Sequence, residues 1–164
     1  MVLDQRDRVL LINARDPVQP AKGEWWEIPG GGMEAGESSA AAAARELFEE
    51  TGISDAQVGP SVWQHRARYT FAGIRFDQLE HIHVARIGPV PEPEPDPVYR
   101  PGGLEAMEAL AFSGLRWWGL DELATLVGTG GRVLPPWLPG ELSRYLIDGP
   151  PAEPLDLGVL PDLF

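Results

Sequence analysis

Stretches of apolar residues predict a β-sheet in the first half of the chain. A continuous apolar run near the N-terminus is typical of a buried strand. Two longer β-rich runs are separated only by Ala72 and Gly73, which predicts a tight hairpin. The expected strands span residues 8–13 with a hairpin partner at 1–3, residues 24–29, residues 61–71, residues 74–87 and residues 116–118.

Between these strands lies a strong helix signal. Five alanines at residues 40–44 favour a helix, Ser38 or Ser39 suits its N-cap, and Gly52 suits the position just past its end. An amphipathic helix at about 137–147 is expected to cover the face of the sheet opposite this first helix. Further helices are expected at residues 104–110 and from residue 120 onward.

The last turns of the first helix carry three glutamates on one face. Glu46, Glu49 and Glu50 are spaced i, i+3, i+4, so the helix is expected to present them outward. Leu47 falls with the alanines on another, apolar face that is expected to point inward. Three adjacent carboxylates repel one another, and they lie at the end of the helix where the dipole disfavours negative charge. A sequence that breaks two local rules at one place indicates a functional site. A hard divalent cation such as Mg²⁺ or Mn²⁺ would compensate the charge.

This stretch resembles the Nudix box. That box has fixed glycines, glutamates, an arginine and aliphatic residues at set spacings over 23 residues, and every fixed place is filled here. The alternative is a surface helix that is acidic by chance. The matching residues are Gly31, Glu37, Arg45, Glu46, Leu47, Glu49, Glu50, Gly52 and Ile53.

The resemblance implies an α/β fold, the α/β/α Nudix sandwich with a mixed central sheet. It also implies a Mg²⁺-dependent pyrophosphohydrolase that cleaves a nucleoside diphosphate linked to another group X. Nucleoside triphosphates, oxidised nucleotides and ADP-ribose are all open as substrates. A nucleotide sensor without catalysis is the alternative, although such modules tend to have damaged boxes. The isomerase branch of the fold needs a catalytic cysteine, and this chain has none.

The resemblance also assigns roles to residues. Arg45 and Glu37 are expected to hold the helix against the glycine turn. Glu108, with Glu105 as second choice, is a candidate for an extra metal ligand or general base; a solvated helix charge is the alternative. Glu46 is either a ligand or the base. The expected metal ligands are the carbonyl of Gly30 and the carboxylates of Glu46, Glu49 and Glu50.

Aromatic and polar residues outside the box offer weaker candidates for substrate contact. Trp25 and Trp26 are neighbours on a strand, so at most one can face a cleft and stack on a base. Glu80 falls on the same strand face as Ile82 and is expected to point inward. It is a candidate for substrate or metal contact, with a salt bridge to an arginine such as Arg68 as the preferred alternative. His81 and His83 are expected on a partly exposed strand face, with a pair of metal ligands as the alternative.

Composition limits the remaining possibilities. The 164 residues favour one domain, residues 1–164. The net charge of −12 opposes binding to nucleic acid or an anionic membrane, because both carry phosphate. With no apolar run near the length of a membrane span, a cytoplasmic protein is expected, and a homodimer is a weak expectation. The proline-rich segment 88–103 is expected to be disordered or a surface loop, with a lid or a dimer arm as the alternatives. Residues 150–164 are expected to be an irregular tail.

Overall fold

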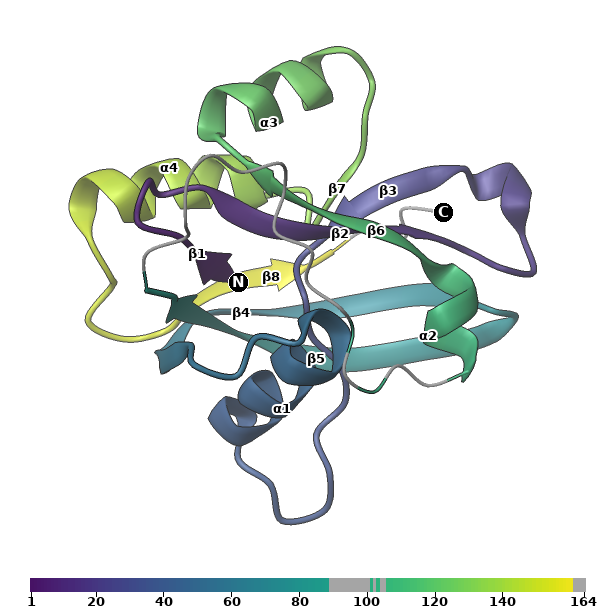
Figure 1. The fold of residues 1–164 in the computed structure, drawn as a ribbon, viewed down its shortest axis with the longest axis horizontal. Coiled ribbons are helices and arrows are strands. Elements are labelled where there is room, and N and C mark those ends of the chain that lie inside the picture. Colours follow the sequence, from purple (N-terminus) through teal and green to yellow (C-terminus); the bar gives the residue numbers. More distant parts are fainter. Residues whose placement is uncertain (89–100, 102, 104–105, 161–164) are drawn as a thin grey trace.

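The computed structural model describes residues 1–88, 101, 103 and 106–160. Within them, eight strands form one mixed, curled sheet in the order β7-β3-β2-β1-β5-β4-β8, with β6 paired to β2 (Figure 1). The strands are β1 (Val2–Leu3), β2 (Val9–Arg15), β3 (Glu24–Glu27), β4 (Gln57–Phe71), β5 (Ile74–Arg86), β6 (Phe112–Trp118), β7 (Val133–Leu134) and β8 (Leu155–Val159). The helices are α1 (Ser39–Thr51), α2 (Ala106–Ala111), α3 (Leu120–Gly128) and α4 (Leu138–Asp148), with a 3-10 turn at Pro20–Lys22.

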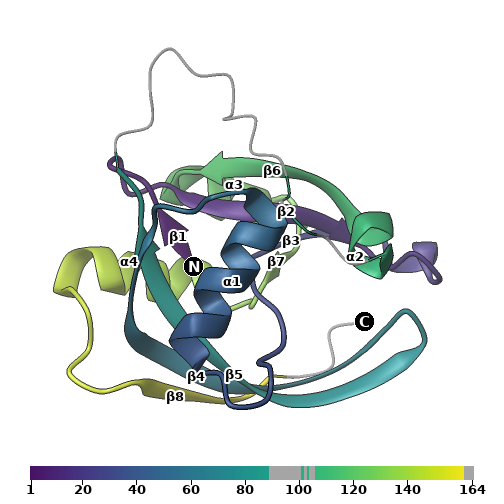
Figure 2. The same ribbon diagram turned by 60° about the horizontal axis from the view of Figure 1, so that its bottom comes forward.

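The sheet is mixed because its short strands join it in parallel. β1 pairs in parallel with β5, β7 with β3 and β8 with β4, whereas the other pairings are antiparallel. The long β4–β5 hairpin turns at Ala72 and Gly73, both with positive φ, as the sequence predicts. Figure 2 shows the resulting curl, with β2 and β6 above and the β4–β5 hairpin below.

Helices cover both faces of the sheet, which confirms the predicted α/β sandwich. Figure 1 shows α1 at the bottom of the molecule and α3 and α4 at the top. Alternate residues of β2 serve the two layers: Leu10 packs with Leu47 of α1, whereas Val9 and Leu11 face α3 and α4. None of the helices in the described residues is long and apolar enough to cross a membrane.

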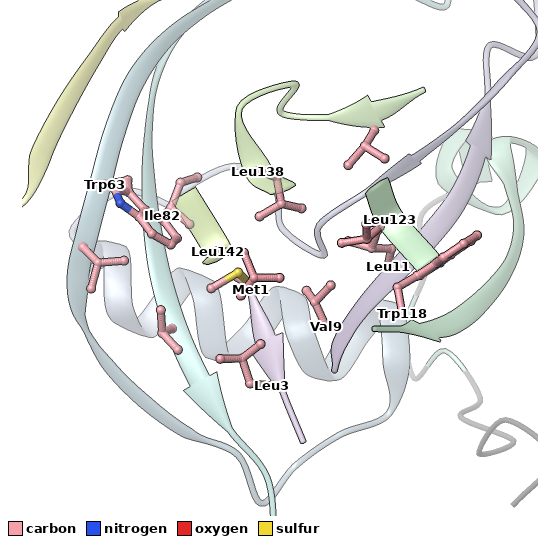
Figure 3. Packing of buried hydrophobic residues seen from close by; sticks show 13 residues of the cluster. Met1, Leu3, Val9, Leu11, Trp63, Ile82, Trp118, Leu123, Leu138 and Leu142 are labelled. Carbon is pink, nitrogen blue, oxygen red and sulfur yellow. The ribbon is translucent and has the colours of Figure 1, made fainter. Parts of the chain in front are cut away.

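The largest of the three hydrophobic cores in the described residues lies between the sheet and α3 and α4 (Figure 3). Leu138 and Leu142 of α4 are fully buried there, and burying each such side chain contributes about 1.5–3 kcal/mol. This helix therefore takes the place predicted for it, opposite α1. The buried residues are Met1, Leu3, Val9, Leu11, Val62, Trp63, Ile82, Val84, Trp118, Leu123, Val133, Leu138 and Leu142.

The structure corrects the prediction for the C-terminal tail. Residues 155–159 are not irregular but form β8, an edge strand parallel to β4. The period-2 spacing of Leu155, Leu157 and Val159 was the signal, although Gly158 and the preceding prolines obscured it. Strand β7 was also missed, because two residues are too few to produce a sequence pattern.

Two other predictions can be tested only in part, because some of their residues lie outside the described ones. Most of the proline-rich segment 88–103 and Glu105 lie outside them. The helix expected at 104–110 is observed as α2, Ala106–Ala111.

Candidate active site

Helix α1 begins and ends where the sequence predicts. Ser38 is the N-cap, and its hydroxyl accepts a hydrogen bond of 3.2 Å from the amide of Ala41. Gly52 adopts the left-handed conformation with φ 78° and donates its amide to the carbonyl of Phe48. These two caps fix where the helix that carries the three glutamates begins and ends.

Arg45 ties three carboxylates and the glycine turn together. Its Nη1 donates to Oε1 of Glu46 at 2.8 Å and to Oε2 of Glu49 at 3.0 Å. Its other nitrogens donate to both carboxylate oxygens of Glu37 at 3.1 Å and to the carbonyl of Gly32 at 2.7 Å. The hydrogen bonds from Arg45 hold the pKa of Glu37 below its usual range, and Glu37 and then Glu46 raise the pKa of Arg45.

The glycine turn lies directly on the carboxylates of α1. The amide of Gly30 donates to Oε2 of Glu50 at 2.8 Å. A Cβ at Gly31 would lie only 2.4 Å from Cδ of Glu46, so that only glycine allows this approach without a shift. The turn therefore brings its backbone into contact with two of the three glutamates.

Burial divides the glutamates, which differs from the outward-facing cluster expected from the helical wheel. Glu46 is only 7% exposed, because the turn folds back over it, whereas Glu49 and Glu50 are half-buried. On the apolar side, Leu47 and Ala42 are buried against the sheet. The wheel gave the phase of the helix correctly but could not show what covers it.

A histidine that the sequence did not single out for the site attaches α1 to the sheet. His83 of β5 is buried, and its Nδ1 lies 2.9 Å from the carbonyl of Gly59. The carbonyl can only accept, so Nδ1 carries the proton and Nε2 accepts from the hydroxyl of Ser39 at 3.0 Å. The expectation that this strand face is partly exposed is therefore wrong at His83, because the start of α1 covers it.

The donor set on α1 suits a hard cation. Three carboxylates and the nearby backbone carbonyls of the glycine turn provide only oxygen, which is what Mg²⁺ and Mn²⁺ prefer. The missing Cβ of Gly31 provides the close approach of turn and helix that a shared site needs. Among the described residues, no three acidic or histidine side chains converge as a ready-made metal site, and Arg45 instead bridges Glu46 and Glu49.

The chain that follows the proline-rich segment returns to this helix. The amide of Gly103 donates to the carbonyl of Glu49 at 3.1 Å. Glu108 lies a few residues later on α2, but its side chain is outside the described part of the structure. The proposed roles of Glu108 and Glu105 therefore stay predictions.

The two tryptophans of β3 face opposite sides, as their alternation predicts. Trp26 packs edge-on against Trp118 with ring centroids 4.9 Å apart, in the largest core. Trp25 is 3% exposed, and its Nε1 donates to Oε2 of Glu27 at 2.7 Å. The ring of Trp25 is therefore covered, and what this residue orients is the carboxyl of Glu27.

Glu80 is half-buried and faces inward as expected, but its partner is not Arg68. Arg68 pairs with Asp77 at 3.3 Å, whereas Oε2 of Glu80 lies 3.1 Å from Nε2 of His65. Burial alone would raise the pKa of Glu80, but the contacts with His65 and Gln78 outweigh it and lower the pKa.

The sequence did not single out Glu27 or His65 as candidate site residues, because nothing in the sequence around them indicates a functional role. Burial, and secondarily the charge of Glu80, raises the pKa of Glu27 to about 7 despite the hydrogen bond from Trp25. His65 is completely buried within the predicted strand. Only the curl of the β4–β5 hairpin brings Glu80 near Glu27 on β3.

Comparisons with known proteins agree with this geometry. The NUDIX domain family model matches residues 1–138. A CMP-5'-(N-acetyl-N-hydroxy-3-aminopropyl)phosphonate hydrolase of Streptomyces rubellomurinus is 32% identical over 133 residues, which are 81% of this chain and 55% of that protein. The uncharacterized Nudix hydrolase YvcI of Bacillus subtilis is 48% identical over 52 residues, 32% of this chain and 29% of that protein.

Solved structures support the fold. The MutT protein of Methanosarcina mazei superposes with a TM-score of 0.54 at 16% identity and covers 90% of this chain and 89% of its own. The chain spans only part of the length of these curated relatives: 55% of the Streptomyces hydrolase and 29% of YvcI. The match to the family model over most of the chain, on the fold and box described above, shows that this protein belongs to the NUDIX family.

Proposed function

We propose that this protein is a metal-dependent Nudix hydrolase that cleaves the diphosphate linkage of a nucleoside diphosphate derivative. The substrate class includes nucleoside triphosphates, oxidised nucleotides and ADP-ribose. The observation that carries the proposal is the arrangement of Arg45, which bridges Glu46 and Glu49 beneath a glycine turn that is bonded to Glu50. Such an arrangement organises a dense group of carboxylates that the helix alone would disfavour.

Mg²⁺ or Mn²⁺ would be held by Glu46, Glu49 and Glu50 with the carbonyl of Gly30. When bound, the cation would neutralise phosphate oxygens and stabilise the leaving phosphate. The residues of the chain do the positioning: the Gly30 amide donates to Oε2 of Glu50 and so orients its carboxylate.

Arg45 orients the remaining carboxylates and limits their repulsion. Its guanidinium lies between Glu46 and Glu49, so both are aimed at the same region while their charges are partly balanced. Glu37 holds Arg45 from the opposite side. A carboxylate takes the proton of the attacking water, and Glu46 and Glu108 are the candidates for this base.

The charge of the chain supports a small anionic substrate rather than a polymer. A net charge of −12 repels nucleic acid, which presents many phosphates beyond the reach of a local cation. We further propose one domain over residues 1–164, a cytoplasmic location and, more weakly, a homodimer. These three proposals rest on length, composition and the resemblance to the family.

The proposal is tested by measuring phosphate and pyrophosphate release from a panel of nucleoside triphosphates, oxidised nucleotides and nucleoside diphosphate sugars including ADP-ribose. Each compound is tested with Mg²⁺, with Mn²⁺ and with a chelator. We expect strong turnover of at least one compound that the chelator abolishes. Tight nucleotide binding without turnover would instead support a sensor, and turnover unaffected by the chelator would contradict the metal site.

A further inference from the structure

A second polar cluster, separate from the carboxylates of α1, lies where β3 faces the curled β4–β5 hairpin. It contains two carboxyl groups, from Glu27 and Glu80. Around them stand an indole N–H, a buried imidazole, an amide and a phenol. The supporting residues are Trp25, His65, Gln78 and Tyr69.

Each carboxyl group of this cluster is held in place by its neighbours. Trp25 donates to Oε2 of Glu27 at 2.7 Å. Gln78 donates to Oε1 of Glu80 at 3.0 Å, and the same amide donates to the hydroxyl of Tyr69 at 3.1 Å. The oxygens of both carboxyl groups therefore have fixed directions, which a loose surface charge would not have.

A buried histidine points into the cluster. The side chain of His65 is 0% exposed, and its Nε2 lies 3.1 Å from Oε2 of Glu80. Its Nδ1 has no hydrogen-bond partner in the described residues. Burying an imidazole whose polar atoms are incompletely satisfied costs free energy. A role in orienting Glu80 explains why a histidine occupies this buried position.

The two carboxyl groups differ in protonation near pH 7. The pKa of Glu27 is raised to about 7 by burial and by Glu80, whereas contacts with His65 and Gln78 lower the pKa of Glu80. Burial and the same two carboxyl groups raise the pKa of Tyr69 to about 12, so its hydroxyl stays protonated. The cluster thus presents a carboxylate beside groups that can donate or accept.

The cluster lies within reach of the proposed catalytic carboxylates. Glu27 is three residues before Gly30, whose amide is bonded to Glu50, and three residues span at most about 11 Å. Glu27 of β3 is the cross-strand partner of Ile12 of β2. Ile12 lies on the same face of β2 as Leu10, which packs on α1, so Glu27 is also on the α1 side. A nucleotide with its phosphates at α1 can therefore reach this cluster with its base.

We propose that Glu27 and Glu80 bind the base end of the substrate and select a base that carries an exocyclic amino group. This inference rests on the proposed function. The negative charge of Glu80 repels phosphate, whereas a cation held by the carboxylates of α1 would attract it, so the phosphates belong at α1 and the base at this cluster. Carboxylate oxygens accept from N–H groups, and a site built to accept an N–H discriminates strongly against an analogue that lacks it.

The test measures binding of AMP, GMP and IMP by calorimetry in the presence of a chelator, so that it does not depend on catalysis. IMP has no exocyclic amino group. We expect AMP or GMP to bind about tenfold or more tightly than IMP, since hydrogen bonds to charged groups are strong. We expect both Glu80→Gln and Glu27→Gln to reduce that preference by about tenfold, because the amide replaces one of the two acceptor oxygens with a donor and cannot carry the charge.

The matched control is Asp77→Asn, which makes the same chemical change on the outward face of the same hairpin, where Asp77 pairs with Arg66 and Arg68. It should keep the preference of the unmodified protein. Thermal unfolding of each variant checks that it is folded. Equal affinities for the three nucleotides, absence of binding, or a preference that survives in both glutamine variants would overturn the inference. Failure of the proposed function would instead show as binding preference without turnover.

Discussion

Gly31 and Glu46 lie so close that a single methyl group would not fit between them: a Cβ on Gly31 would be 2.4 Å from Cδ and 2.5 Å from Oε1 of Glu46. Glu46 cannot easily retreat, because it is buried and its Oε1 is bonded to Arg45 at 2.8 Å. The requirement for glycine in the box thus has a direct steric cause at this position.

We therefore predict that Gly31→Ala displaces the Glu46 carboxylate. A displacement of about 1 Å at a catalytic group can cost about 10²-fold in rate, so kcat should fall to that extent. Gly32→Ala is the matched control, since nothing lies within 4 Å of a Cβ at that position. Steady-state kinetics on the substrate found in the panel decide the matter, and equal rates for the two variants would refute the steric argument.

For Glu50→Gln we expect a folded protein with little turnover. The amide oxygen of glutamine can still accept from Gly30, so the turn should stay in place, but the charge that would hold the cation is lost. We expect a fall in kcat of about 10²–10⁴-fold and a weaker response to added Mg²⁺. Glu153→Gln, at an exposed position in the tail, is the control. Activity close to that of the unmodified protein would eliminate Glu50 as a metal ligand.

Glu108→Gln distinguishes two interpretations of that residue. If Glu108 is the general base, kcat should fall by about 10²-fold while thermal stability is unchanged, because only proton transfer is lost. The pH dependence of the residual rate should change as well, since a titrating group is removed. A variant with unaltered kcat and pH profile would show that Glu108 is a solvated helix charge, and Glu46 would become the preferred base.

The carboxyl of Glu27 should make stability depend on pH. Its pKa is about 7 in the folded protein and near the ordinary value of 4.5 after unfolding, so the folded state retains a proton that the unfolded state releases. The free energy of unfolding should therefore fall as the pH rises from 4.5 through 7. Glu27→Gln, which cannot ionise, should remove that fall.

We expect Glu27→Gln to be more stable than the unmodified protein by about 1–2 kcal/mol at pH 8, with little difference at pH 4.5. This is less than the full shift would give, because the carboxyl is half-buried and water screens it. Urea unfolding at both pH values measures the difference. Glu24→Gln, an exposed position on the same strand, should show no such change with pH. A stability difference that does not vary with pH would contradict the raised pKa.

Much of the molecule could be predicted from local sequence signals. The caps at Ser38 and Gly52 act through backbone groups of their own helix, so both ends of α1 follow from the sequence. The hairpin turn at Ala72 and Gly73 is equally local. The box spacing likewise placed three glutamates on one face, because the helical period alone fixes their phase.

Other features depended on contacts between distant segments. The sequence indicated that Glu80 faces inward but not that His65 is its partner, since that pairing needs the register of β4 against β5. Glu46 is buried only because the glycine turn folds over it, and strand β8 exists only because β4 offers an unpaired edge.

The sequence by itself determined the secondary structure of the box and the family to which the protein belongs, because these depend on residue type and spacing along one segment. The tertiary structure alone decided which carboxyl groups are buried and which of them lie close together. Glu27 and Glu80 are 53 positions apart, and only the curl of the sheet places the charge of Glu80 where it raises the pKa of Glu27. Electrostatic effects act through space and burial, and neither can be read from a linear pattern.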